Sequence, residues 1–186
     1  MRNILLIICL LMIGNSLHGQ KFGIKTNLLY DATATINLGI ETALGKRTTL
    51  DISGNYNAWD FGDARWRHWM VQPEFRVWLC ERFNGHFFGL HGHAGEHNIG
   101  GFNPFGLDES LKYKRHQGEF WGAGLSYGYQ WILNDRWNLE LTAGAGFVRV
   151  HNKEYPLAEC GIFENEKWHT YWGPTKLGIS FIFMIK

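Results

Sequence analysis

The sequence predicts an all-β fold, an eight-stranded antiparallel transmembrane β-barrel with its strands in an up-and-down meander. Eight segments of alternating apolar and polar residues follow one another, and no helical pattern of useful length separates them. The connections alternate between short and long, as in the barrels of bacterial outer membranes. The apolar faces also carry more aromatic bulk than the inside of an eight-stranded barrel could hold.

The clearest strand pattern lies in residues 66–95. Every second residue over positions 69–79 is apolar and most of those between are polar, which is the period of a strand. A polar link at residues 84–85 leads to a second alternating run, in which Phe88 and Leu90 share a face, so the pair predicts a β-hairpin. The predicted strands are residues 21–31, 35–44, 48–58, 66–80, 86–96, 118–132, 137–150 and 171–186.

The connections between these segments are unequal in a regular way. Tight links are predicted at residues 45–47, 81–85 and 133–136, and longer ones at residues 59–65, 97–117 and 151–170. Only the connection at residues 32–34 departs from this alternation, because it is short where a long one is expected. Outer-membrane barrels have short periplasmic turns and longer extracellular loops in this alternation. We therefore expect the long segments to lie outside the cell.

The orientation of the faces follows from side-chain volume. A soluble lipocalin-like barrel would show the same alternation, but an eight-stranded interior has room only for packed side chains or one small ligand. Turning the strand of Arg76 over would also place a guanidinium in hydrocarbon, at a cost of about 2–4 kcal/mol. The apolar faces, which we expect to contact outer-membrane lipid, carry Trp69, Phe75, Phe88, Trp121, Tyr127, Tyr129, Trp131, Trp137, Phe147, Phe181 and Phe183.

The opposite faces mix glycine with charged and polar residues, which predicts a narrow polar interior. Paired carboxylates and bases can perform acid–base catalysis when a pocket separates their pKa values. An interior this small leaves a substrate no room, so we expect the charges to pair with one another, because an unpaired buried charge is costly. The predicted barrel-interior polar network consists of Lys25, Glu41, Asp51, Gln72, Glu74, Arg76, Glu140 and Lys176.

The first residues predict a secretory signal peptide. Arg2 precedes an apolar run over residues 4–13, and small and polar residues follow up to Gly19. We expect residues 1–19 to be the signal peptide and residues 20–186 to form one barrel domain outside the cytoplasm. The formal net charge of +1 gives no electrostatic footprint for nucleic acid.

Histidines on one strand face raise the question of a metal site. His91 and His93 lie two residues apart with Glu96 and His97 close by, and such imidazoles can bind zinc. Neither a Cys-x-x-Cys nor a His-Glu-x-x-His pattern accompanies them, and histidines on a polar strand face are more often hydrogen-bonded interior groups. The sequence therefore predicts no metal site and no cofactor.

Two cysteines, Cys80 and Cys160, remain after the expected cleavage. Secretion would favour a disulfide between them. Cys80 ends a predicted strand at a periplasmic link, whereas Cys160 lies in a predicted extracellular segment. Because a membrane core of about 30 Å would separate the two thiols, we expect both to be unpaired.

Three stretches of the sequence resemble a known family. They are KTNLLYDATATINLGIE at residues 25–41, the Asn55-Tyr56-Asn57 tripeptide, and RHWMVQPEFRVWLCERFNGHFFGLHGHAG at residues 67–95. They are similar to the small outer-membrane proteins of Bacteroidota grouped as domain-of-unknown-function family 3575, over essentially the whole mature chain. The resemblance implies an envelope β-barrel in the outer membrane of a Gram-negative bacterium, with members often encoded near fimbrial and other surface components. It implies no catalytic residue.

The longest connections predict the function, because they exceed what a strand link requires. Aromatic anchors within a polar rim are typical of protein or glycan contacts, and the alternative is that these loops fold down on the barrel rim. We therefore expect a non-enzymatic structural or accessory surface protein that engages a cell-surface partner through its loops, with fimbrial or other surface assembly as the implied setting. The candidate partner-binding residues are Phe102, Phe105, Tyr113, Tyr155, Phe163 and Trp168.

The alternative is an enzyme that modifies lipid A or phospholipid, since some outer-membrane proteins of this architecture act on lipid A. Such chemistry needs a nucleophile or base beside a carboxylate at the outer leaflet. His116, Glu119 and His151 are the candidates, but no serine in a Gly-x-Ser-x-Gly context accompanies them, so we predict no catalytic residue. A diffusion pore is disfavoured by the filled interior.

Overall fold

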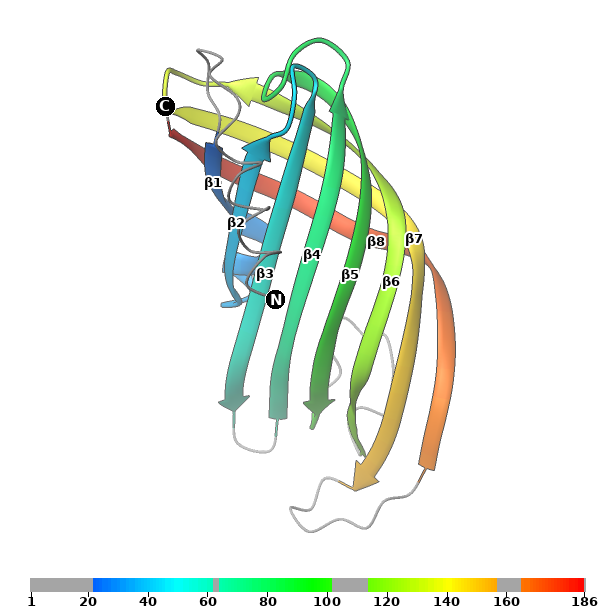
Figure 1. Ribbon diagram of the computed structural model, residues 1–186. Coiled ribbons are helices and arrows are strands. Elements are labelled where there is room, and N and C mark those ends of the chain that lie inside the picture. The colour runs from blue at the N-terminus through cyan, green and yellow to red at the C-terminus, as the bar shows by residue number, and fades with distance from the viewer. Residues whose placement is uncertain (1–21, 62–63, 102–113, 157–164, 186) are drawn as a thin grey trace, which may run out of the picture.

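The computed structural model describes residues 22–61, 64–101, 114–156 and 165–185. Each strand pairs with its sequence neighbours, and the last pairs back with the first to close a barrel (Figure 1). This confirms the prediction of an all-β fold with eight antiparallel strands in up-and-down order. The strands are β1 (Phe22–Asn27), β2 (Ile36–Ala43), β3 (Thr48–Phe61), β4 (Ala64–Trp78), β5 (Gly85–Gly100), β6 (Lys114–Ile132), β7 (Trp137–Pro156) and β8 (Asn165–Ile185).

The two ends of the barrel differ in their connections. Residues 44–47, 79–84 and 133–136 join strands at one end, which we call the turn end. Leu44 N donates to Thr48 O and Leu133 N to Trp137 O, both at 2.9 Å, so these turns are tight. The opposite end, called the loop end, holds the connections that follow β1, β3, β5 and β7.

The first predicted strand, residues 21–31, is wrong in its second half. β1 ends at Asn27, and a short helix, α2 (Leu28–Ala32), follows. The Asn27 side chain accepts a hydrogen bond from Leu29 N at 3.1 Å, which caps the helix in the manner of an N-cap asparagine. In the part of the chain that the structure describes, no helix has the length and apolar character of a membrane span.

The predicted long connections are shorter than expected. The supposed loop at residues 59–65 is a hairpin in which Phe61 pairs with Ala64, and β5, β6, β7 and β8 all run into the two longer predicted loops. Figure 1 shows β3–β8 extending well past the ends of β1 and β2. Polar side chains occupy both faces of these extensions, so the alternation that marks a strand is lost there while the backbone pairing continues.

The strands are staggered around the ring. A row of paired residues that leaves β1 at Phe22 reaches β8 at Pro174, although Phe22 itself pairs with Ile185. Such an offset tilts the strands relative to the barrel axis. A bulge between Gly144 and Ala145 leaves Thr175 as the extra residue of β8.

The two faces of the sheet reverse the usual arrangement of a soluble protein. Many outward-facing side chains on β2–β8 are large, apolar and exposed, among them Leu38, Ile52, Trp69, Val71, Phe75, Val77, Phe88, Leu90, Trp121, Leu125, Leu141, Leu177, Ile179 and Phe181. Most of the buried side chains are polar or charged. Exposed apolar patches on soluble monomeric proteins are rarely this extensive.

Glycines on the inner wall make room for the largest interior side chains. A Cβ at Gly124 would lie 2.9 Å from the His91 ring, and one at Gly128 would lie 2.6 Å from Cε1 of Phe87. Gly39 similarly faces the Lys25 stem, at 2.7 Å from its Cγ. The glycines of the polar face therefore accommodate specific bulky neighbours on the adjacent strands.

Candidate functional site

Arg76 on β4 is the centre of a buried cluster of charges inside the barrel. Its Nε donates to Glu74 Oε2 at 2.6 Å, and its Nη1 donates to Glu41 Oε2 at 2.9 Å and Glu140 Oε2 at 2.7 Å. Its Nη2 reaches Asp51 Oδ2 at 3.2 Å. The arginine side chain is fully buried, so its charge is compensated entirely by carboxylates from β2, β3, β4 and β7.

Two lysines complete this buried charge cluster. Lys25 Nζ lies 3.0 Å from Asp51 Oδ2 and 3.3 Å from Glu41 Oε2, and Lys176 Nζ donates to Glu74 Oε2 at 2.9 Å. Three cations therefore contact four carboxylates, and these charged side chains come from β1–β4, β7 and β8. Hydroxyl groups donate further hydrogen bonds to the carboxylates, from Thr49, Ser126 and Thr142.

Gln72 differs from the other members of the predicted interior network. Its side chain is buried on the inward face, but its amide nitrogen has no hydrogen-bond partner among the described residues. It lies one inward position from Glu74 toward the loop end. The structure thus brings together seven of the eight predicted residues and leaves Gln72 beside them.

An apolar plug closes the interior at the turn end, which sequence reasoning missed. It consists of Trp78, Phe83, Phe87, Ile182 and Met184, each at most 2% exposed. The Arg76 guanidinium lies 4.3 Å from the centroid of the Phe87 ring, so the plug directly underlies the charge cluster. The available signal was the loss of alternation near the turns, where neighbouring residues on both faces are apolar.

The histidines suggested as zinc ligands face the interior, whereas the neighbouring Glu96 lies on the other face of the sheet. His91 and His93 are buried in the interior with their rings 5.8 Å apart, and His91 Nε2 lies 2.9 Å from Thr175 Oγ1. Glu96 faces outward, where it accepts a hydrogen bond from Trp69 Nε1. Among the described residues, no group of three or more His, Cys, Asp or Glu side chains is arranged to hold a metal ion.

The three residues considered for lipid chemistry do not converge either. His116 is buried in the interior, with its Nδ1 2.6 Å from the Asn152 side-chain nitrogen. Glu119 and His151 project from the opposite face of the sheet, with Oε1 and Nδ1 3.6 Å apart. A base and a carboxylate are thus adjacent on the outer wall without His116.

The predicted partner-binding residues prove to belong to different settings. Tyr155 lies in β7 and Trp168 in β8, so their placement in loops was wrong. The Arg115 guanidinium lies 5.1 Å from the Tyr155 ring, and Trp168 stacks on His151 with ring centroids 4.4 Å apart. Outside the described residues lie Phe102, Phe105, Tyr113 and Phe163.

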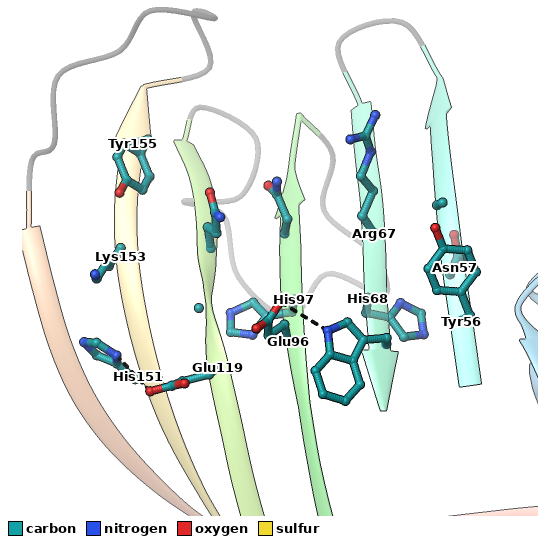
Figure 2. A pocket seen from close by; sticks show the side chains of 15 residues that line it. Tyr56, Asn57, Arg67, His68, Glu96, His97, Glu119, His151, Lys153 and Tyr155 are labelled. Carbon is teal, nitrogen blue, oxygen red and sulfur yellow. Dashed lines mark hydrogen bonds and ion pairs between the residues drawn. The ribbon is translucent and has the colours of Figure 1, made fainter. Parts of the chain in front are cut away.

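A hollow of about 570 Å³ lies on the outer wall near the loop end. Strand pairing places its outward-facing lining in two adjacent rows that cross β3 to β7, the first being Tyr56, Trp69, Glu96, Glu119 and His151, and the second Ala58, Arg67, Asn98, Gln117 and Lys153. Figure 2 shows Glu96, Glu119 and His151 at one level, with Lys153 and Tyr155 nearer the strand ends. We call this feature the wall hollow.

The chain was compared with known protein families, curated proteins and solved structures. The model of the family described as "Protein of unknown function (DUF3575)" matches residues 5–185. The chain belongs to this family. Neither the curated proteins nor the solved structures include a significant match. The family membership agrees with the resemblance seen in the sequence, and the chemistry must be argued from the site itself.

Proposed function

We propose that this member of the DUF3575 family is an outer-membrane β-barrel that serves as a closed, non-enzymatic anchor for a contact surface at its loop end. The observation that carries the proposal is the inversion of its faces. Large apolar side chains are exposed outward on β2–β8, whereas six charged side chains are buried inside, with the partly buried Lys176 beside them. Lipid is the partner that can cover an apolar belt on all sides at once.

The filled interior supports an anchor in preference to a pore. The apolar plug occupies the turn end, and the charge cluster lies directly above it. The hollow lined by Lys25, Asp51 and Arg76 has a volume of only about 30 Å³, which is room for one or two water molecules. A solute would have to break several buried ion pairs in order to pass.

The expected signal peptide and the short turns orient the barrel in this proposal. We place the turn end in the periplasm and the loop end outside the cell of a Gram-negative bacterium, as in other outer-membrane barrels. The loop end then carries the surface that meets a cell-surface protein or glycan. We assign this contact to the outer wall together with the predicted residues of segments 102–113 and 157–164, which lie outside the described residues.

A lipid-modifying enzyme is the second candidate function. The observation that favours it is the His151–Glu119 pair on the outer wall, which resembles a base beside a carboxylate. Among the described residues lining the wall hollow there is no serine, threonine or cysteine for the pair to activate, and the hydroxyl groups there belong to Tyr56 and Tyr155. Mass spectra of lipid A from cells with and without the gene distinguish the two functions, and an altered spectrum would favour the enzyme.

The membrane proposal is tested by one substitution on the apolar belt. Val77 is 44% exposed on the outward face, and Val77→Arg places a charge in hydrocarbon at a cost of about 2–4 kcal/mol. We expect a reduced yield of folded protein in the outer-membrane fraction, detected by heat-modifiable migration in detergent gels. Gln117→Arg, exposed on the same face near the loop end, is the matched control and should assemble normally. Equal yields of the two variants, or recovery of a soluble periplasmic protein, would overturn the membrane assignment.

The orientation is tested separately at Cys80, which is exposed and has a free thiol at the turn end. In a Cys160→Ser background, a membrane-impermeant maleimide should leave Cys80 unlabelled in intact cells and label it after permeabilisation. Labelling in intact cells would place the turn end outside and reverse the proposed orientation.

A further inference from the structure

The wall hollow begins where the apolar belt ends. On β4 the outward residue that follows Val71 toward the loop end is Trp69, which lines the hollow. On β6 the outward residue that follows Trp121 in the same direction is Glu119, which also lines it. In a membrane barrel this position is the interface between hydrocarbon and water, where amphipathic aromatic side chains gather.

The aromatic side chains of the hollow present flat, accessible surfaces. Tyr56 is 57% exposed and Trp69 is 41% exposed, and they are direct cross-strand neighbours. The Trp69 indole N–H donates to Glu96 Oε2 at 3.1 Å, which holds the ring in a fixed orientation. Tyr155 stands on the opposite side of the hollow, on β7. Rings fixed in this way supply contact area at a small cost in conformational entropy.

Two carboxylates face each other in the floor of the hollow. Glu96 and Glu119 are directly paired across β5 and β6, and like charges in opposite positions destabilise a sheet. One indole N–H approaches Glu96, and the His151 ring lies 3.6 Å from Glu119. Because an ionised carboxylate can accept about four hydrogen bonds, both retain capacity for further donors. The pair therefore destabilises the folded sheet, and a ligand that donates hydrogen bonds to both carboxylates would relieve this repulsion.

The cations near the hollow are less available than its carboxylates. The Arg67 guanidinium is engaged with Asp60, to which its Nε donates at 2.9 Å. The second row otherwise presents the amides of Asn98 and Gln117, with Lys153 at the edge on β7. The two carboxylates would repel an anionic ligand such as phosphate, whereas they would accept hydrogen bonds from a hydroxyl or amine group.

We propose that the wall hollow binds a neutral or amine-bearing sugar of a glycan, with a face of the sugar ring packed on Trp69 and its hydroxyl or amine groups donating to Glu96 and Glu119. Aromatic faces, paired carboxylates and amides are together the chemistry that recognises a sugar. A volume of about 570 Å³ is within the size range of small-ligand sites. The inference deepens the proposed function by naming a ligand class, and it rests on that function for access at the cell surface.

Titration of purified barrel in detergent tests the site without relying on its location in the cell. The probes are N-acetylglucosamine disaccharide, glucosamine disaccharide and inorganic phosphate, with binding followed by isothermal calorimetry. We expect saturable binding of one or both sugars and none of phosphate. Trp69→Ala and the Glu96→Gln/Glu119→Gln double variant should each weaken sugar binding about tenfold or more. A tenfold increase in Kd corresponds to a loss of about 1.4 kcal/mol in binding free energy.

Matched controls separate the site from the fold. Trp131 is 40% exposed on β6 near the turn end, so Trp131→Ala removes an equally exposed indole away from the hollow. Glu81→Gln removes an exposed carboxylate in a turn-end connection. Both controls should bind sugar as the unmodified protein does, and heat-modifiable migration verifies that every variant is folded.

The source of the sugar is tested in two further arms, with micelles of purified outer-membrane glycolipid and with the soluble oligosaccharide released from it. Binding of both supports the sugar site, and tighter binding of the glycolipid would identify a membrane glycolipid as its source. Binding of the glycolipid alone would show that its lipid part is recognised and would overturn the sugar site. Binding of the released oligosaccharide alone supports a soluble glycan. Absence of saturable binding in all arms, binding of phosphate alone, or unchanged binding in the Glu96→Gln/Glu119→Gln variant would overturn the proposal. Sugar binding by a protein found outside the outer membrane would leave the site standing and refute the anchor.

Discussion

The charge cluster inside the barrel and the wall hollow on its outside use the same kinds of residue to different ends. In the interior, Arg76 is fully buried and contacts four carboxylates, and two lysines bring the cluster close to neutrality. In the wall hollow, Glu96 and Glu119 face each other across neighbouring strands with an indole and an imidazole beside them. The interior charges compensate one another, whereas those of the hollow remain open to further donors.

This difference indicates that the interior charges serve stability, whereas those of the wall hollow are available for binding. A buried charge must be paired at its own site, because removal of one partner leaves an uncompensated charge in a medium of low dielectric. A charge on the outer wall is solvated, so it needs no partner within the protein and can bind a ligand. Substitutions inside should therefore change stability, and substitutions at the hollow should change binding.

The largest effect is expected for Arg76→Leu. The variant leaves four buried carboxylates with only Lys25 and Lys176, and we expect a loss of about 3–5 kcal/mol in the free energy of unfolding. Urea unfolding followed by tryptophan fluorescence in detergent measures it. Arg67→Leu at the hollow is the control, because Arg67 and its partner Asp60 are both exposed, and its unfolding curve should match that of the unmodified protein. Equal destabilisation by the two substitutions would remove the distinction between the regions.

A medium effect is expected for Gly128→Ala on the inner wall. The added methyl group would lie 2.6 Å from Cε1 of Phe87 and 2.8 Å from the Leu141 carbonyl oxygen, so the plug must shift at a cost of about 1–3 kcal/mol. Gly54→Ala is the matched control, since the nearest atom to its added methyl group is 4.0 Å away. Its stability should change by less than about 1 kcal/mol in the same unfolding measurement. A larger loss at Gly54 than at Gly128 would contradict the fit of glycines to interior side chains.

The smallest effect compares two tryptophans. Trp78 Nε1 donates to Thr49 Oγ1 at 2.9 Å inside the barrel, and Trp78→Phe should cost about 1 kcal/mol by removing this buried hydrogen bond. Trp69 Nε1 donates to Glu96 on the exposed wall, so Trp69→Phe should change the free energy of unfolding by less than about 0.5 kcal/mol. The same Trp69→Phe variant should weaken sugar binding. A stability loss at Trp69 as large as at Trp78 would argue for a structural role of the hollow.

The hairpin and the lengths of the connections predicted the order of the strands. Alternation of side chains predicted the eight strands and which residues share a face, because these follow from the two-residue period of the backbone. It failed wherever both faces carry the same kind of residue. Both are apolar around Trp78 and Phe87, where the plug lies, and both are polar beyond Glu96, where the strands extend. The cap at Asn27 is a local hydrogen bond that a period does not reveal.

The wall hollow was not predictable from the sequence for a different reason. Its carboxylates, Glu96 and Glu119, lie on separate strands, and only the register of β5 with β6 places them opposite each other. Register depends on where each turn and bulge falls, and a shift of one strand by one residue would move its glutamate to the other face and separate the pair. In the sequence Glu96 is adjacent to His97, but the strand pleat places its side chain on the outer face, away from the interior histidines.

The origin of the interior cations has a consequence for how the protein folds. Lys25 is on the first strand and Lys176 on the last, while Glu41, Asp51 and Glu74 are on the three strands that follow the first. In a partly assembled sheet that lacks β1 and β8, Arg76 is the only cation of the cluster that can pair with these carboxylates. Excess negative charge then faces an unsealed lumen, and it is neutralised only as β1 and β8 pair. Folding should accordingly be all-or-none, with truncation of either terminal strand producing the same defect.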